Sequence, residues 1–450
     1  MSISAIASWT GGELSRGDAA AEVDSVCTDS RALKPGALFV ALRGDKFDGH
    51  DFIRQAAQSG AAGAVVEDAP ADLPGDFPVI RVRDTLEALQ RMAAGYRRTL
   101  PMKVINITGS NGKTSTKDFT AAALAGRGPV AKTEGNLNNH IGLPLTILRA
   151  SPQDAFGVFE IGMNHPGEIA PLARISRPDA GVITNIGMAH IEHMGSQEAI
   201  ALEKGMLAEA VGPEGFVVLP ADDAFTDSIA ARTRAKVIRA GLDHGDVYAS
   251  DVRIDAEGSH FVAHSGGRSA EGWIAASGRH MVQNAMLALA VAVEYGAPLE
   301  ESLDGLRGAK LTRGRLERRM VRGVCILDDS YNANPDSMVA ALETLGRMPG
   351  RHIAVLGQMN ELGAASDRGH RRVGEAAARE KIDCVITVGP IAAGIAAAAR
   401  MLGVRHVLTA ETTGEAAAIL RGIVRDGDTV LIKGSRSVKM ETIVEELSRS

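Results

Sequence analysis

The chain has 450 residues, of which 45% are hydrophobic and 23% are charged, and its formal net charge is −6 at pH 7. These values are typical of a globular protein with several domains and exclude a disordered chain. The acidic balance and the aromatic content of 4% argue against a nucleic-acid-binding surface. Because neither a signal peptide nor an apolar run of ~20 residues is visible, we expect a cytoplasmic location without a membrane span.

The first segment, residues 1–101, alternates short apolar strands with helical patterns. Its clearest helix places Leu89 and Met92 on one face and has Asp84 as the expected N-cap. Pro101 then interrupts the chain before the next strand. The other predicted elements are strands at 37–42 and 64–66 and a helix at 51–59.

A glycine-rich turn near the start of the second segment, residues 102–313, is the most informative motif. It lies between a buried strand at 104–107 and a helix expected at 114–124. Backbone N–H groups in such a turn bind polyphosphate at the positive end of the helix, Lys113 would reach the outer phosphates, and the Thr114 hydroxyl could hold Mg²⁺. A structural surface turn is the alternative, which the flanking strand and helix disfavour. The turn, shorter than the common P-loop, is Gly109-Ser110-Asn111-Gly112-Lys113-Thr114-Ser115.

Further strands alternate with helices along the second segment, and this pattern predicts a mostly parallel sheet covered by helices on both faces. Residues 246–277 are predicted to form short strands with hairpin turns, followed by a helix at 281–295. The expected strands are residues 158–161, 181–186 and 216–219.

Three side chains in this segment, but not Lys204, are candidate ligands. Glu160 ends a strand next to the nucleotide-binding strand, where a carboxylate could bind the nucleotide's Mg²⁺, and the alternative is a strand-end acid without a role. His190 and His193 follow another strand, and their local sequence leaves a ligand role and a surface role equally open. Composition alone indicates that Lys204 is a solvated helix lysine.

The third segment, residues 314–450, is predicted to be a second doubly wound α/β unit. In such sheets ligands bind outside the carboxyl ends of the strands, where polar residues gather here. The loop that includes Asp329, Tyr331 and Asn332 is predicted to contact a ribose or phosphate, with a capped turn as the alternative. A second polar turn, predicted to bind an anion, contains Lys433, Ser435 and Arg436. The expected elements are strands at 324–328, 353–357, 385–389 and 430–433 and a helix at 372–381.

These motifs together resemble the Mur ligases, the ATP-dependent enzymes that build peptidoglycan precursors. The resemblance covers nearly the whole chain. It implies an N-terminal domain at 1–101 for a UDP moiety, a central ATPase at 102–313 and a C-terminal Rossmann-like domain at 314–450. The stretches that carry it, besides the P-loop, are residues 28–31, 47–50, 135–142, 329–335 and 433–436.

The resemblance also implies roles for individual residues. Lys204 matches a carbamylated lysine that, with His190, holds a second Mg²⁺, and Glu160 matches the ligand of the nucleotide's own Mg²⁺. Further residues match contacts to ATP, namely Asn284, Arg315, Asp329 and Tyr331. Residues that match contacts to the other substrates are Ser30, Arg31, Asn138, Asn139, Asn332, Lys433, Ser435 and Arg436. The chain departs from the common pattern at Met206, Met281 and Gln358.

The loop at 329–335 indicates the branch of the family that joins D-alanyl-D-alanine to UDP-N-acetylmuramoyl-tripeptide through an acyl phosphate. The alternatives are another Mur-type amino-acid ligase or a folylpolyglutamate synthase, a non-catalytic ATP-binding scaffold, and a P-loop kinase that forms a stable phosphate ester. The sequence leaves open whether the third peptide residue is lysine or diaminopimelate, and we expect a monomer.

Overall fold

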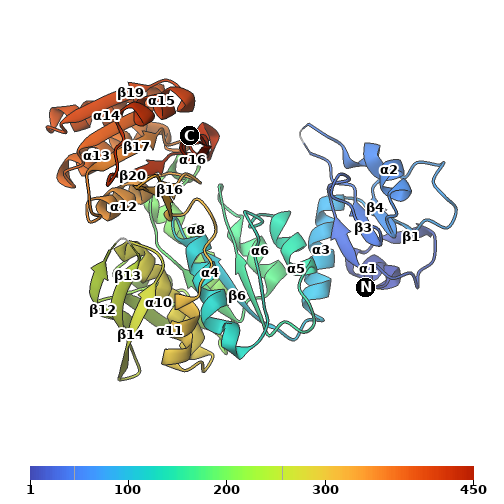
Figure 1. Ribbon diagram of the computed structural model, residues 1–450. Helices are drawn as coiled ribbons and strands as arrows, with labels where there is room; N and C mark the ends of the chain where they lie inside the picture. The colour runs from blue at the N-terminus through green and yellow to red at the C-terminus, as the bar shows by residue number, and fades with distance from the viewer. Residues whose placement is uncertain (45, 256, 450) are drawn as a thin grey trace. The chain divides into compact units, whose positions relative to one another are not determined.

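The computed structural model describes residues 1–44, 46–255 and 257–449 (Figure 1). The chain forms two compact units, each made of separate stretches of sequence. Unit 1 consists of Met1–Asn106, Gly128–Met163 and Glu168–Asp179, and unit 2 consists of Ile107–Arg127, Asn164–Gly167 and the chain from Ala180 onward. None of the helices within the described ranges has the length and apolar character that crossing a membrane requires.

Unit 1 contains a five-stranded sheet in the order β1-β5-β4-β3-β2. Only β1 runs antiparallel to its neighbour, and the remaining pairs are parallel. Helix α3 (Thr85–Arg97) begins as predicted, because the Asp84 side chain accepts a 2.8 Å hydrogen bond from the backbone N–H of Glu87. The other elements of this layer are α1 (Ile3–Thr10), β1 (Glu13–Arg16), β2 (Ser25–Cys27), β3 (Ala37–Val40), α2 (Ile53–Gln58), β4 (Gly63–Val66) and β5 (Val79–Arg81).

The remainder of unit 1 is formed by stretches from the first half of the second predicted segment. Strand β6 (Lys103–Thr108) begins here and passes into unit 2 at Ile107. Strands β7 (Val130–Lys132) and β8 (Phe156–Glu160) are parallel, and all five β8 residues are buried. Helix α3 packs against α5 (Gly142–Leu148) and α6 (Ile169–Ser176). Leu89 and Met92, which belong to the apolar face predicted for α3, are both buried.

The central part of unit 2 has its strands in the order β14-β13-β12-β11-β10-β9. The pairs from β9 to β12 are parallel, and β12, β13 and β14 form the predicted antiparallel hairpins. The helix that follows the glycine-rich turn, α4, packs against α10 and α11 (Figure 1). The bounds are α4 (Lys113–Leu124), β9 (Ala180–Ile183), α7 (Ile191–Met194), α8 (Gln197–Ala210), β10 (Phe216–Pro220), α9 (Thr226–Ala230), β11 (Lys236–Leu242), β12 (Val247–Ile254), β13 (Ser259–Ser265), β14 (Arg268–Ile274), α10 (Arg279–Glu294) and α11 (Leu299–Arg307).

The C-terminal part of unit 2 is a six-stranded sheet in the order β15-β16-β20-β17-β18-β19. Only β15 is antiparallel to its neighbour, as expected of a mostly parallel α/β unit. The bounds are β15 (Glu317–Val321), β16 (Val324–Asp329), α12 (Pro335–Leu345), β17 (His352–Gly357), α13 (Ser366–Arg379), β18 (Cys384–Val388), α14 (Ala393–Met401), β19 (His406–Ala410), α15 (Thr413–Ile423), β20 (Thr429–Lys433) and α16 (Glu441–Arg449).

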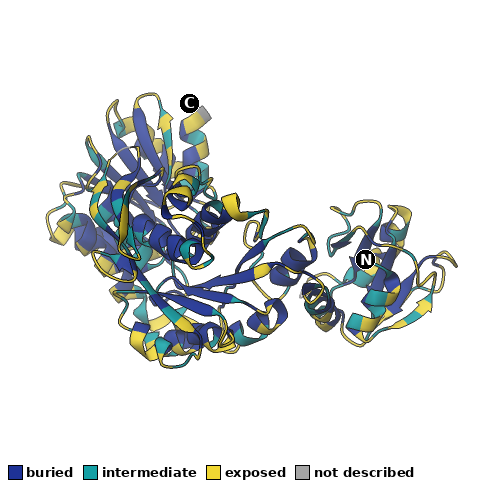
Figure 2. Cartoon of the chain, turned by 90° about the horizontal axis from the view of Figure 1, so that it is seen from below, coloured by how far each residue is buried: buried dark blue, intermediate teal, exposed yellow. Residues whose placement is uncertain are grey.

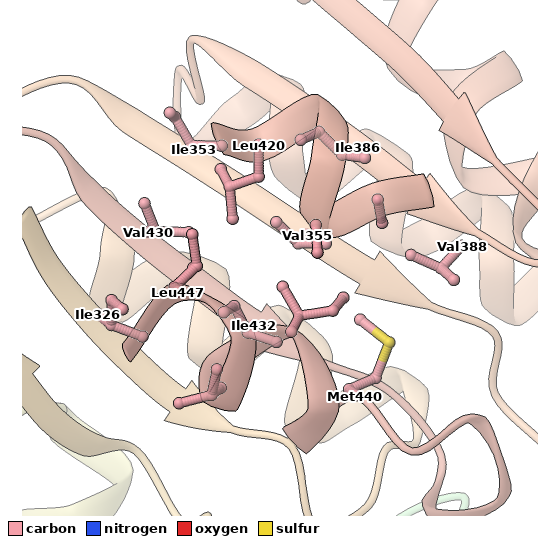
Figure 3. Close-up of a cluster of buried hydrophobic side chains, with 14 of the residues drawn as sticks. Ile326, Ile353, Val355, Ile386, Val388, Leu420, Val430, Ile432, Met440 and Leu447 are labelled. Carbon is pink, nitrogen blue, oxygen red and sulfur yellow. The ribbon is translucent and has the colours of Figure 1, made fainter. Parts of the chain in front are cut away.

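Apolar side chains from the central strands form the core of this sheet. Figure 3 shows Val430 and Ile432 of β20 beside Ile326 of β16 and Val355 of β17, under α15 and α16. Buried residues follow the strands in both units, whereas exposed residues follow the connecting loops (Figure 2). Cys325 of β16 and Cys384 of β18 are both buried in this sheet.

Candidate active site

The glycine-rich turn connects β6 directly to α4, as the sequence predicted. Gly109 and Gly112 have φ angles of 148° and 78°, which side chains with a Cβ rarely adopt. A Cβ on Gly109 would lie 1.8 Å from Thr184 Oγ1, and one on Gly112 would lie 2.4 Å from Asn284 Oδ1. Both glycines are therefore required by backbone conformation and by close packing.

Residues after β9 hold the turn in place. The Ser110 N–H donates to the Asn185 carbonyl at 3.0 Å, and the Asn111 N–H donates to Asn185 Oδ1 at 2.9 Å. The Gly187 N–H donates to Ser110 Oγ at 2.8 Å. These hydrogen bonds fix the turn before any ligand binds, which lowers the entropic cost of ordering it around an anion.

The first turn of α4 places a lysine, two hydroxyl side chains and a helix N-terminus beside the glycine-rich turn. This helix of 12 residues has its positive end at the glycine-rich turn, and Thr114 and Ser115 are 4% and 6% exposed. Lys113 Nζ donates to the Gly109 carbonyl at 2.8 Å, so its ammonium group lies over the turn. The geometry is that of a polyphosphate site.

Lys204 corrects the interpretation that composition alone gave. It is a buried residue of α8, 1% exposed, and not a solvated lysine. Burial is the main cause that lowers the pKa of Lys204 well below its ordinary value; Lys113 lowers it further and Glu203 opposes the shift. Within residues 1–44, 46–255 and 257–449, we find no hydrogen bond or ion pair to this amine. The pattern missed its burial because the neighbours of Lys204 in the sequence, Glu203 and Gly205, are not apolar and so do not mark this face of α8 as covered.

His190 lies in unit 2 and has a left-handed backbone conformation, with φ 61°. Its Nδ1 forms an ion pair with Glu361, whose own φ is 59°. The His190 side chain lowers the pKa of the Glu361 carboxyl by hydrogen bonding, against the opposing effect of burial. His193 instead stacks on His165 at a ring-centroid distance of 4.5 Å. Two contacting residues with left-handed backbones are unusual and are typical of functional sites.

Glu160 and Asn138 lie together in unit 1. Glu160 is the last residue of β8 and is 3% exposed, and Asn138 Nδ2 donates to its Oε1 at 2.7 Å. Asn139 Oδ1 accepts from the N–H of Gly142, the first residue of α5, at 2.9 Å. In the same unit, Ser30 is half-buried, and the exposed Arg31 is held by Asp29 through two hydrogen bonds of 2.9 and 2.8 Å. This pairing and a backbone hydrogen bond lower the pKa of Asp29 to about 2.

The structure brings together the predicted residues of the C-terminal segment. Lys433 Nζ donates to Asp329 Oδ2 at 2.6 Å and to the Asn332 carbonyl at 3.0 Å. Arg315 stacks on the Tyr331 ring, with Cζ 4.0 Å from the centroid, and its Nη2 donates to Thr114 Oγ1 at 3.4 Å. The buried Arg315 Nε has no hydrogen-bond partner among the described residues. An arginine with an unused donor thus lies over the first turn of α4.

The anion turn predicted after β20 contributes to the same cluster. Arg436 Cζ lies 5.7 Å from the centroid of the Tyr331 ring. Ser435 is buried, and its Oγ accepts from the Asn360 N–H at 2.9 Å. Tyr331 therefore has one arginine from each of two distant parts of the sequence beside its ring.

The remaining candidates are buried or partly buried near these groups. Asn284 of α10 is 5% exposed and lies directly behind Gly112, with Met281 one turn before it. Gln358 Nε2 donates to Asn360 Oδ1 at 3.3 Å. Met206 Sδ accepts from Arg232 Nη2 at 3.3 Å. The three departures from the family pattern thus fill packed positions in unit 2.

Three contacts in unit 2 were missed because their partners are far apart in the sequence. Asp118 of α4 accepts from the Thr312 N–H at 2.9 Å and from its hydroxyl at 2.8 Å. Asn334 Nδ2 donates to Asn111 Oδ1 at 2.6 Å, and Asp336 accepts from the Met188 N–H at 2.9 Å. No local pattern could have indicated these pairs.

The donors offered to a metal ion are of mixed kinds. No group of three or more His, Cys, Asp or Glu side chains is arranged to hold a metal within the part of the chain that the structure describes. The Thr114 hydroxyl suits a nucleotide-bound Mg²⁺. The buried amine of Lys204 suits carbamate formation, because the unprotonated amine is the form that reacts with CO₂ and its lowered pKa favours that form.

Three family models match the chain and leave only short stretches between them. They are described as Mur ligase family, catalytic domain, for residues 22–97; Mur ligase middle domain, for residues 107–292; and Mur ligase, glutamate ligase domain, for residues 314–436.

Curated relatives and solved structures agree with these models. A UDP-N-acetylmuramoyl-tripeptide--D-alanyl-D-alanine ligase of Escherichia coli (strain K12) is 38% identical over 95% of this chain and 94% of its own length. A crystal structure of MurF from Acinetobacter baumannii matches with a TM-score of 0.91 and 31% identity, covering 100% of this chain and 99% of that one. MurF ligase from Thermotoga maritima in complex with ADP matches with a TM-score of 0.85 and 28% identity, covering 94% of this chain and 97% of that one.

Proposed function

Because this chain belongs to the Mur ligase family, we propose that it joins D-alanyl-D-alanine to UDP-N-acetylmuramoyl-tripeptide, with release of ADP and phosphate. The observation that carries the proposal is the polyphosphate site at the start of α4, with Arg315 placed over it. The 38% identity to a ligase of this name over 95% of the chain supports the choice of substrates.

Activation of a carboxylate is the central chemical problem of this reaction. A carboxylate is a poor electrophile, so the terminal carboxylate of the tripeptide attacks the γ-phosphate of ATP and forms an acyl phosphate. The N–H groups at the start of α4, Lys113 and Arg315 stabilise the charge that develops on the transferred phosphoryl group. The amine of D-alanyl-D-alanine then attacks the acyl carbon, and phosphate leaves.

The metal ligands are part of the proposal. When bound, Mg²⁺ neutralises phosphate charge and orients the reacting oxygens. We assign Thr114 to the nucleotide's ion and His190 and Lys204 to a second ion. The role of Glu160 as a ligand of the nucleotide's ion stays a prediction from the resemblance. Lys204 would serve as its carbamate, because a carbamate is anionic and can ligate, whereas an ammonium group cannot.

We assign the contacts to ATP and to the other two substrates to separate groups of residues. Ser30 and Arg31 in unit 1 would contact the uridine nucleotide, and Asn138 and Asn139 the acceptor and the acyl phosphate. Asn284, Asp329 and Tyr331 would contact ATP, and the other substrate contacts would come from Asn332, Lys433, Ser435 and Arg436. Each assignment extends the resemblance to a position where this chain has the matching side chain.

We also propose three functional domains at residues 1–101, 102–313 and 314–450, which the limits of the three matching family models support. A cytoplasmic location and a monomeric state complete the proposal. The substrates named for the relatives leave open whether the third peptide residue is lysine or diaminopimelate.

One reaction mixture tests the proposed function. Purified protein, ATP, Mg²⁺, UDP-linked tripeptide and D-alanyl-D-alanine should give the UDP-linked pentapeptide by mass spectrometry, with one phosphate released per amide bond. Parallel mixtures contain lysine, diaminopimelate or glutamate as the amine. A product with one of these, or a stable phosphate ester, would replace the proposal by a sister ligase or a kinase.

The Lys113→Ala variant is the matched control. It should retain the wild-type circular dichroism spectrum and lose ligation by about 1,000-fold, because it lacks the cation that meets the outer phosphates. Phosphate release at the wild-type rate by this variant would contradict the assignment of the nucleotide site.

A further inference from the structure

The first turn of α12 makes a contact that helix capping alone does not need. Asn334 is the N-cap, and its Oδ1 accepts from the Ser337 N–H at 3.0 Å in a capping box. Its amide nitrogen points elsewhere and donates to Asn111 Oδ1 at 2.6 Å. Asn111 lies at the middle of the glycine-rich turn, so this side chain joins α12 to the phosphate-binding loop.

A second side chain of the same turn contacts the segment that follows β9. Asp336 Oδ2 accepts from the Met188 N–H at 2.9 Å, and its Oδ1 accepts from Arg372 Nη1 at 2.7 Å. The approach is so close that a Cβ on Gly187 would lie 2.5 Å from Asp336 Oδ2. The ion pair with Arg372 orients the Asp336 carboxylate toward the Met188 N–H.

The two contacts meet in the phosphate-binding loop. Gly187, which Asp336 covers, donates its N–H to Ser110 Oγ at 2.8 Å. Asn111, which Asn334 contacts, is the next residue of the loop and donates its own N–H to Asn185. One helical turn from the C-terminal sheet therefore touches the loop directly at Asn111 and indirectly through Gly187.

The first turn of α12 directly follows a loop with predicted ATP contacts, so its own contacts also affect where that loop lies. Helix α12 begins directly after the loop that bears Asp329, Tyr331 and Asn332. When the turn docks on the glycine-rich loop, it also fixes where these side chains lie relative to bound phosphate. A shift of about 1 Å in such groups can lower a rate by about 100-fold.

We propose that Asn334 and Asp336 are positioning residues that couple docking of the C-terminal sheet to the geometry of the phosphate-binding loop. This inference rests on the proposed function, because it assigns the loop to ATP. Neither side chain touches the reacting atoms. They act by holding Asn111 and the Gly187–Met188 peptide, so their loss weakens ATP binding and leaves binding of the UDP substrate unchanged.

A double-mutant cycle on the Gly187–Asp336 contact tests the proposal. Gly187 does not have a positive φ, so an alanine there meets only the close approach to Asp336. The variants are Gly187→Ala, Asp336→Ala and the double variant, and KM for ATP and Kd for ADP are measured for each. Each single variant should raise both constants by about 10-fold, and the double variant should be within about 3-fold of Asp336→Ala, since the clash is removed.

Conservative variants separate positioning from helix stability. Asp336→Asn keeps an acceptor for the Met188 N–H and should raise KM for ATP by about 3-fold only. Asp367→Ala removes an exposed carboxylate from the first turn of α13 and should leave all constants within about 2-fold of wild type. A loss at Asp336 that lowered thermal stability and kcat but not the affinity for nucleotide would assign it a structural role and overturn the proposal.

The double-mutant cycle can still be interpreted if the protein proves not to have the proposed function. ADP affinity reports on the loop even when the wild-type protein makes no pentapeptide, so absence of product alone would refute the choice of substrates. Equal effects of Gly187→Ala in the wild-type and Asp336→Ala backgrounds would show that the two residues act independently, and would overturn the coupling.

Discussion

Two buried lysines in unit 2 differ in what surrounds their amines. Lys433, at the end of β20, is 3% exposed and donates to the carboxylate of Asp329 and to a backbone carbonyl. Lys204, in α8, is 1% exposed, and Glu203 raises its pKa without a hydrogen bond to it. Burial lowers the pKa of both amines, but only at Lys433 does a hydrogen-bonded carboxylate oppose the shift.

The difference indicates two uses of one side chain. A lysine paired with a buried carboxylate stays a cation and fixes the loop that bears its partner. A buried lysine without such a pair favours the neutral amine, which is a nucleophile. The comparison therefore predicts that Lys433 positions its surroundings, whereas Lys204 is available for modification by CO₂.

The largest effect should come from Lys204. Lys204→Ala is expected to lose about 1,000-fold in ligation, because it lacks the amine that we propose to carry a carbamate ligand of the second Mg²⁺. Acetate or another short carboxylic acid should restore part of the rate, whereas Lys204→Arg, which keeps a cation, should stay inactive in its presence. Full activity of the wild-type protein in CO₂-free buffer would break the comparison, because it would leave the amine unmodified.

A smaller effect is expected at Lys433, and it concerns stability. Lys433→Met leaves the Asp329 carboxylate buried and without its cation, which should cost about 3 kcal/mol in urea unfolding. Adding Asp329→Asn should recover at least half of this loss. Lys204→Met, measured without Mg²⁺ and CO₂, should cost less than Lys433→Met, since no ion pair is broken. If Lys433→Met and Lys204→Met lowered the free energy of unfolding equally, the proposed difference between the paired and the unpaired lysine would be wrong.

The smallest expected effect is a pH dependence of stability, which arises from a histidine near Lys433. His280 faces Asp329 and Lys433, and burial lowers its pKa from 6.5 to about 4. Between these values the unfolded chain binds more protons than the folded one, so stability falls as the pH drops from 6.5 to 4. His280→Gln should remove about 2 kcal/mol of this fall, less than the full shift implies because the side chain is partly exposed. If the stability of wild type and of His280→Gln changed equally between pH 6.5 and pH 4, His280 would not be the source of the pH dependence.

The strands that bury both faces were predictable, and the edge strands of the C-terminal sheet, β15 and β19, were not. Strands β8, β16 and β20 contain uninterrupted apolar runs, which the sequence displays directly. Strand β15 contains Glu317, Arg318 and Arg319, and three of the five residues in β19 are exposed, so neither has an apolar run. Edge strands rely on one neighbour for their hydrogen bonds, and this leaves little trace in composition.

The candidate site was predictable where its chemistry is local. The glycine-rich turn combines the required backbone conformation, a helix N-terminus and a lysine within seven residues. The sequence of the motif therefore suffices to predict phosphate binding there. Asn334, Asp336 and Glu361 contact residues more than 140 positions away, and nothing in their own neighbourhoods indicates the partner. Their roles depend on how two sheets pack, which only the folded structure contains.

The order of strands in the C-terminal sheet has a consequence during synthesis on the ribosome. Strand β20 is made last, yet it lies between β16 and β17 and supplies Val430 and Ile432 to the core (Figure 3). Until Lys433 has been translated, β16 and β17 lack their shared neighbour and expose unpaired edges. Prematurely terminated chains would therefore remain targets for proteases and chaperones, so that only completed polypeptides escape degradation.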